Sequence, residues 1–126
     1  MRRLNICEER GSGIDKVISQ AELFQLPAPE FLSYENHTKA VMFAHRKLTE
    51  MDRQDKMRAC YQHACLLHVS SQIMTNATLR KRFSIDEHNY AIASRIISDT
   101  IKVGWIKPQD PESTSRKHAR YIPFWA

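Results

Sequence analysis

The sequence contains no uninterrupted run of about 18 apolar residues, the length that a membrane-spanning helix needs. Residues 1–9 hold no apolar segment that could act as a secretory leader, so we expect a cytoplasmic protein with no membrane partner. The three cysteines are an odd number and widely spaced, at Cys7, Cys60 and Cys65, which does not fit a disulfide framework. A reducing compartment is therefore the expected setting.

Glycine is also scarce, with 3 residues in 126, and the glycine-rich nucleotide motifs are missing. Gly11 and Gly13 flank Ser12 at the expected start of a helix, a setting that can hold a phosphate group. The third glycine of a dinucleotide fingerprint and the Gly-Lys-Ser/Thr of a P-loop are absent, so a flexible helix start is the simpler interpretation. Because no acidic constellation for Mg²⁺ is present either, we expect no enzymatic activity and no cofactor.

Cysteine and histidine alternate in one segment, at Cys60, His63, Cys65 and His68, which raises the question of a zinc site. On a single helix, His63 and Cys65 point about 160° apart and cannot share a tetrahedral ion. Cys60 and His68 are separated by more than two turns, about 12 Å, which is too far for a nucleophile and its base. We therefore predict that Cys60 and His68 are core residues and that no metal binds here.

The overall composition is that of an ordinary globular domain, with 42% hydrophobic and 26% charged residues. A length of 126 residues suits one domain with a small appendage and is too short for a multidomain enzyme. The net charge of +5 is unevenly placed, because residues 73–126 have 9 basic and 5 acidic side chains whereas residues 1–72 have 10 and 9. Such asymmetry is typical when one part of a protein meets a polyanion, although this charge is also common on ordinary surfaces.

The first expected element is a helix that begins at Ser12, where Ser12 and Asp15 form a capping-box pattern. Its apolar positions, which recur at helical spacing until Pro27, are Ile14, Val17, Ile18, Ala21 and Phe24. Residues 38–44 are rich in β-forming residues and lack a helix cap, which predicts a strand. One strand does not make a sheet, so it would pair with the C-terminal strands, with a second copy of the chain or with a neighbour outside this sequence.

Three further helices are expected. Residues 52–70 show a core-facing apolar stripe at helical spacing, and Thr75 can cap a short second helix. A third helix is expected over residues 87–103, with Gly104 as the residue that ends it.

A β-hairpin is expected after the third helix, with strands at residues 105–107 and 118–124. Three helices followed by such a hairpin is the chain order of a winged helix, in which the third helix lies in the DNA major groove and the hairpin is the wing. The predicted class is α+β: a winged helix-turn-helix DNA-binding domain at residues 47–126, preceded by a helix–strand extension at residues 1–46.

Apolar residues, including Tyr90, Ile92 and Val103, cover well over half of the third helix and are expected to pack, which leaves a narrow exposed arc. On that arc Arg95 can donate two hydrogen bonds to a guanine edge, and Lys102 is placed for phosphate. The wing adds hydroxyls and permanent cations, which suit phosphates and a minor groove. The candidate DNA-binding residues are His88, Ala91, Ser94, Arg95, Ser98 and Lys102 on the helix and Ser113, Ser115, Arg116, Lys117 and Arg120 in the wing.

A further basic run, Arg80-Lys81-Arg82, lies on the expected second helix. It either braces the DNA backbone or is a solvated helix face, and the sequence favours neither interpretation.

Several motifs lie at the two ends of the chain: Arg10-Gly11-Ser12-Gly13-Ile14-Asp15, Leu26-Pro27-Ala28-Pro29-Glu30-Phe31, Ser94-Arg95-Ile96-Ile97, Gly104-Trp105-Ile106-Lys107-Pro108 and Arg120-Tyr121-Ile122-Pro123-Phe124-Trp125-Ala126. Together they resemble the C-terminal portion of bacterial and archaeal transcriptional regulators labelled RecG-like ATP-dependent DNA helicase-related proteins. The resemblance covers nearly the whole chain and is weakest near residues 47–54.

The resemblance implies a longer regulator, in which a Schlafen/AlbA-type nucleic-acid-binding domain and a divergent histidine-kinase-like ATPase domain precede a winged helix. Residues 1–46 would then be the last piece of the ATPase-like domain, with Gly11 and Gly13 matching its glycine motif. Residues 38–45 would be a sheet strand whose partners are missing. The acidic Mg²⁺-binding segment and most of the nucleotide-facing sheet are absent, so we expect no nucleotide binding by this chain.

The sequence thus predicts a non-enzymatic DNA-binding module of a transcriptional regulator, with double-stranded DNA as its partner. The alternative is a protein-interaction module, in which the strand at residues 38–45 joins a homodimer and the exposed helix face meets a partner. An ATPase fragment is a third interpretation, which needs parts that this sequence does not contain.

Overall fold

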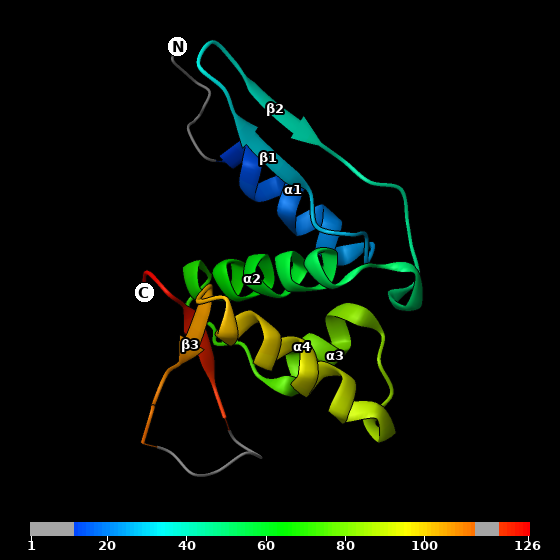
Figure 1. Ribbon diagram of the computed structural model, residues 1–126, viewed down its shortest axis with the longest axis vertical. Coiled ribbons are helices and arrows are strands. Elements are labelled where there is room, and N and C mark those ends of the chain that lie inside the picture. The colour runs from blue at the N-terminus through cyan, green and yellow to red at the C-terminus, as the bar shows by residue number, and fades with distance from the viewer. Residues whose placement is uncertain (1–11, 113–118) are drawn as a thin grey trace.

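The computed structural model describes residues 12–112 and 119–126, and in this part of the chain it has an α+β structure (Figure 1). Four α-helices and two antiparallel hairpins follow one another as α1 (Ser12–Leu23), β1 (Glu30–Ser33), β2 (Thr38–Val41), α2 (Arg53–Val69), α3 (Asn76–Phe83), α4 (Tyr90–Lys102), β3 (Ile106–Pro108) and β4 (Tyr121–Pro123). Two 3₁₀ helices, η1 (Leu48–Glu50) and η2 (Glu87–Asn89), precede α2 and α4. Figure 1 shows α1 and the β1–β2 hairpin on one side of α2, with α3, α4 and the second hairpin on the other.

Helix α2 is the central element, and it forms where the sequence predicts it. Asp52 caps its first turn by accepting a hydrogen bond from the backbone N–H of Asp55 at 2.7 Å. Cys60 on α2 belongs to the main core, whereas His63 is buried on the side that faces α1. The helix therefore packs on two sides, so that it separates the N-terminal elements from the C-terminal ones.

The main core lies between α2, α3, α4 and β3. Its buried members are Cys60, Ala64, Met74, Leu79, Ala93, Ile96, Ile97 and Ile106. Burial raises the pKa of the Cys60 thiol to about 12. The prediction that Cys60 lies in the core is confirmed, whereas His68 is only half-buried and its ring forms a T-shaped pair with Trp125 at a centroid distance of 5.3 Å.

Helix α3 begins at the predicted cap. The Thr75 side chain accepts from the backbone N–H of Thr78 at 3.3 Å, and the Thr78 hydroxyl accepts from the backbone N–H of Thr75 at 3.0 Å. Leu79 fixes the helix in the core, and Ser84 ends it in a left-handed conformation with φ of 56°. A capped two-turn helix therefore lies across the start of α4.

Helix α4 differs from its prediction at the N-terminal end and in the width of its packed face. Residues 87–89 form η2, and the α-helix begins only at Tyr90. The prediction that Tyr90, Ile92 and Val103 pack is wrong, since these side chains are 62%, 42% and 45% exposed. Helical periodicity gives the direction of an apolar face but not how much of it a neighbouring helix covers. The buried residues of α4 form a narrower stripe, Ala93, Ile96, Ile97 and Thr100.

The second hairpin is antiparallel, with Ile106 opposite Pro123 and Pro108 opposite Tyr121. Strand β3 has the predicted length but lies one residue later, whereas β4 is shorter than predicted, since it begins three residues later and ends one residue earlier. The backbone N–H of Tyr121 also donates to the carbonyl of Met74 at 2.9 Å, which attaches β4 to the segment just before α3. Gly104, with φ of 83°, makes the predicted exit from α4 into this hairpin.

The prediction that the strand at residues 38–45 lacks a partner is wrong. Strand β2 pairs with β1, with Glu30 opposite Val41 and Ser33 opposite Thr38, and it ends at Val41. The sequence did not suggest β1 because four residues directly after the Pro27-Ala28-Pro29 segment give too short a pattern. We call residues 12–46, which contain α1 and this hairpin, the arm.

The arm is joined to α3 through a basic residue that the sequence placed in a charged run. Arg82 is buried, and its Nε donates to Glu22 Oε1 at 3.2 Å while Nη2 donates to the Leu26 carbonyl at 2.5 Å. Burial lowers the pKa of this guanidinium, and the Glu22 carboxylate opposes that effect. Neither interpretation of the run therefore holds for Arg82, because it packs inside the fold.

No helix among the described residues combines the length and the apolar character that crossing a membrane requires. The same residues contain no group of three or more His, Cys, Asp or Glu side chains placed to hold a metal ion.

Candidate nucleic-acid interface

The exposed side of α4 carries the candidates that the sequence placed on the third helix. His88 lies on η2, and the other five follow along α4. All six are exposed: His88, Ala91, Ser94, Arg95, Ser98 and Lys102. The exposed arc predicted for the third helix is therefore present on α4, and the elements beside α4 determine which ligands this arc can contact.

A groove of about 1000 Å³ lies between α3, α4 and β4, and we call it the hairpin-side groove. It brings together four candidates: Ala91, Ser94 and Ser98 from α4, and Arg120, which directly precedes β4. Its other lining residues are Thr75, Asn76, Ala77, Arg80, Glu87, Tyr90, Ala119 and Tyr121. Hydroxyls and two arginines beside a helix and a hairpin supply the donors that phosphate oxygens accept.

Asn76 organises this groove, although the sequence analysis did not single it out. Its Nδ2 donates to the Ser94 hydroxyl at 2.9 Å and to the Tyr90 carbonyl at 3.1 Å, which ties α3 to α4. Its Oδ1 accepts from Arg80 Nε at 2.7 Å, so the arginine is held along the same wall. The only signal in the sequence is its position directly after the cap residue Thr75.

The opposite wall of the groove belongs to β4. The Arg120 carbonyl accepts from the backbone N–H of Gln109 at 2.8 Å, and the bond from Tyr121 to Met74 holds the next residue. The Arg120 side chain is exposed, whereas the Tyr121 phenol is partly buried, which raises its pKa. The candidates Ser113, Ser115, Arg116 and Lys117 lie outside the described residues.

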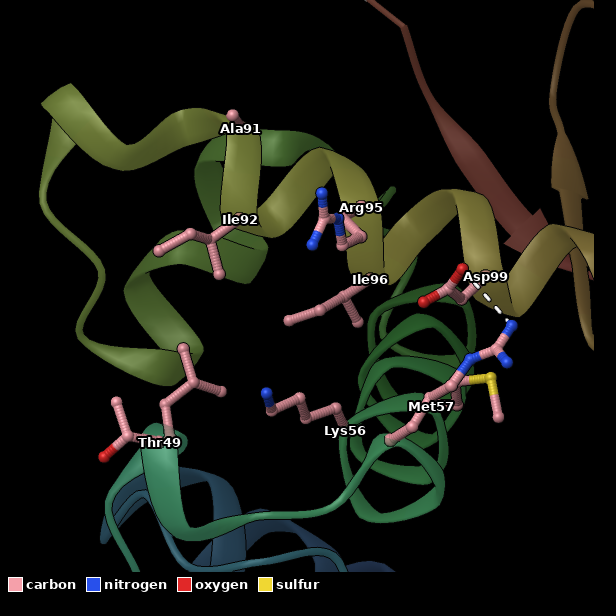
Figure 2. Close-up of a pocket in the computed structure, with 10 residues that line it drawn as sticks. Thr49, Lys56, Met57, Ala91, Ile92, Arg95, Ile96 and Asp99 are labelled. Atoms are coloured by element: carbon pink, nitrogen blue, oxygen red, sulfur yellow. Dashed lines mark ion pairs between the residues drawn. The ribbon is translucent and has the colours of Figure 1, made fainter.

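Arg95 points away from this groove into a second one of about 660 Å³, between α4, η1 and the start of α2 (Figure 2). We call it the α2-side groove. It is lined by Leu48, Thr49, Arg53, Lys56, Met57, Ala91, Ile92, Arg95, Ile96 and Asp99. Ala91 lines both grooves, so α4 forms a ridge between them.

The α4 candidates are divided between the two grooves, and the sequence alone could not show this division. Ser94 and Ser98 lie on the hairpin side and Arg95 on the α2 side, while His88 and Lys102 line neither groove. Asp99, which shares the arc with Arg95, is paired with Arg53 at 3.4 Å. Arg53 and Lys56 are therefore cations beside α4 that the helical pattern of α4 alone did not reveal.

The arm is the part of the chain for which a known family is found. Residues 1–42 match the family model described as "Putative ATP-dependent DNA helicase recG C-terminal". No curated protein and no solved structure matches the chain.

The recG C-terminal match confirms the resemblance at the N-terminal end. Within the described residues it includes α1 and both strands of the first hairpin, and it stops one residue after β2. In the structure Gly13 lies in the first turn of α1, while Gly11 lies outside the described residues. The match does not extend to α2, α3, α4 or the second hairpin, so the resemblance of residues 94–126 stays a prediction.

Proposed function

We propose that the chain binds double-stranded DNA as a winged helix, with α4 in the major groove and the second hairpin as the wing. The order of α2, α3, α4, β3 and β4 supports this proposal, because three helices followed by an antiparallel hairpin is the winged-helix order. The recG C-terminal family match of the arm supports a role as the C-terminal module of a transcriptional regulator.

The hairpin-side groove is the observation that carries the proposal. It collects Ser94, Ser98, Arg80 and Arg120 around a hollow on the side of α4 that faces the hairpin. DNA phosphates accept hydrogen bonds from hydroxyls and arginines, and such contacts fix the register of a protein on the duplex. Arg95, on the other side of the ridge, would then read a base edge, while the phosphate contacts supply most of the affinity.

We further propose that this module catalyses no reaction. The Cys60 thiol is buried in the main core, and a pKa of about 12 keeps it protonated and unreactive at neutral pH. Burial also raises the pKa of Cys65, the other thiol among the described residues. The exposed side chains of the hairpin-side groove suit binding rather than bond breaking.

Fluorescence anisotropy with a labelled random-sequence duplex, measured at several salt concentrations, tests the proposal. We expect the affinity to fall steeply with salt, and Arg120→Gln to weaken binding and lower the log–log slope by about 1. Lys39→Gln, an exposed change on β2, is the matched control and is expected to leave binding unchanged. Absence of binding at low salt, or equal effects of both substitutions, would contradict DNA binding through this face.

A second candidate function, dimerisation through the arm, has its own observation. Ile14, Leu23 and Phe24 of α1 and the adjoining turn are 53%, 70% and 62% exposed, although they belong to an apolar pattern. Strand β2 could add a second copy along the edge that β1 does not occupy. Light scattering over a concentration series tests this function, with Phe24→Ser expected to shift the mass toward the monomer.

A further inference from the structure

The α2-side groove has an apolar floor. Met57 and Ile96 are buried at its base, while Ile92 stays 42% exposed along its wall. Its volume of about 660 Å³ lies in the range of pockets that bind small organic molecules. An apolar ligand body placed here would cover the exposed isoleucine and remove that surface from water.

Cationic groups surround this floor. Arg95 enters from α4 and Lys56 from α2, and within the described ranges neither forms an ion pair. Figure 2 shows the Lys56 ammonium directed into the space between Ile92 and Thr49. Arg53 differs, because Asp99 already neutralises it at the end of the groove. Two cations that have no ion-pair partner among residues 12–112 and 119–126 therefore face an apolar hollow.

We propose that the α2-side groove binds a small organic anion. Its apolar body lies against Ile92 and Ile96, and its carboxylate or sulfonate lies between Lys56 and Arg95. Charge-assisted hydrogen bonds from an ammonium and a guanidinium hold the acid group, and the apolar floor rejects inorganic anions that cannot use it.

A bound anion also affects DNA, and this step rests on the proposed function. Arg95 is the side chain expected to read a base, and a ligand that occupies its guanidinium withdraws it from the duplex. The ligand also adds negative charge close to the DNA phosphates. Because coupling between two ligands is reciprocal, the anion weakens DNA binding by the same factor as DNA weakens anion binding.

Dye binding to the full chain tests the site. The probe is 1-anilinonaphthalene-8-sulfonate (ANS), and N-phenyl-1-naphthylamine is the neutral analogue with the same rings. We expect saturable ANS binding that weakens at least about tenfold in the Lys56→Gln/Arg95→Gln double variant and is unchanged in Lys39→Gln. The neutral analogue should bind wild type more weakly than ANS and should not distinguish wild type from the double variant. Equal ANS affinity of the double variant and wild type overturns the proposal.

Two further variants locate the dye. Ile92→Ser removes part of the groove wall and is expected to weaken ANS binding, whereas Phe124→Ser changes an exposed aromatic ring outside this groove and is expected to have no effect. Loss of ANS binding in Phe124→Ser, with Ile92→Ser unaffected, overturns the proposal because the dye then occupies another surface. Unfolding midpoints of both variants confirm that the comparison concerns folded protein.

DNA titrations with and without ANS separate this inference from the proposed function. Lys56→Gln should keep wild-type DNA affinity in the absence of dye, and it should remove the antagonism that saturating ANS causes in wild type. If Lys56→Gln weakens DNA binding without dye and lowers the salt slope by about 1, the groove contacts the DNA backbone and the anion proposal is overturned. If ANS binds as expected and DNA does not bind at any salt concentration, the anion site stands and the proposed function fails.

Discussion

The Glu22 carboxylate and the Arg82 guanidinium meet across 60 residues of sequence, with Nε 3.2 Å from Oε1. The same carboxylate places Oε2 2.8 Å from Nδ1 of His63. One acidic residue of α1 therefore contacts α2 and α3 together. It links the segment that matches the recG C-terminal family to the helices beyond it.

Removing this carboxylate is expected to destabilise the fold strongly. The Arg82 side chain is 2% exposed, so Glu22→Ala leaves a buried cation without its counter-charge. We expect a loss of about 3–5 kcal/mol in the free energy of unfolding, measured by urea denaturation. Arg46→Gln is the control, because Arg46 pairs with Asp55 while 45% exposed, and about 1 kcal/mol or less is expected there. Equal losses in the two variants would show that the buried pair stabilises the fold no more than the exposed pair does.

Cys60 predicts a stability change at alkaline pH. Its pKa is raised by burial from 9.0 to about 12, so the folded state holds the proton more tightly than the unfolded state does. The resulting stability is complete below about pH 9 and is lost as the pH rises toward 12, with a limiting slope of about 1.4 kcal/mol per pH unit. Unfolding of wild type and Cys60→Ala between pH 7 and 11 measures it. The variant should start lower because of the cavity, and it should lose less stability with rising pH. Parallel curves would refute the assignment.

Asn76 is expected to act on DNA binding through its neighbours. Asn76→Ala removes the bonds that hold Ser94 and Arg80 along the hairpin-side groove, so we expect DNA affinity to fall by about fivefold, equivalent to about 1 kcal/mol. Because no charge is removed, the salt slope should stay unchanged, whereas Arg80→Gln should lower both the affinity and the slope. Anisotropy titrations of both variants distinguish these results. A reduced slope in Asn76→Ala would mean that the asparagine does more than position its neighbours.

Gly104 offers a test of the turn between α4 and β3. Its φ of 83° disfavours residues with a side chain, although an added Cβ would meet no atom within 4 Å. The cost of Gly104→Ala is therefore conformational, about 1–2 kcal/mol, and Gly104→Asn should cost less because asparagine tolerates this region better. Thermal unfolding of the three proteins gives the order. An alanine variant as stable as wild type would show that the turn can relax.

Local signals in the sequence predicted the helices well. Thr75 and Gly104 mark helix ends that depend on neighbours a few residues away, and each occupies the predicted position. Features that depend on distant partners were missed. Strand β1 is recognisable only through its pairing with β2, and the burial of Arg82 depends on Glu22 at the other end of a long segment.

The candidate interface shows the same limit. Helical periodicity correctly predicted that Ser94, Arg95 and Ser98 are exposed, because the angular position of a residue around a helix follows from its number alone. It could not show that a ridge separates Arg95 from the two serines, since η1 and α2 form one groove and α3 and β4 form the other. It also assigned Ile92 to the core, although that side chain borders an open groove.

The hydrogen bond between Tyr121 and Met74 connects the two walls of the hairpin-side groove at one end. Met74 directly precedes Thr75, the residue that caps α3, so β4 is attached where α3, the opposite wall, begins. The width of the groove is consequently set when the protein folds, before any ligand binds. A rod-shaped partner of matching width meets a preformed gap and loses little affinity to rearrangement, whereas a wider one has to break this attachment.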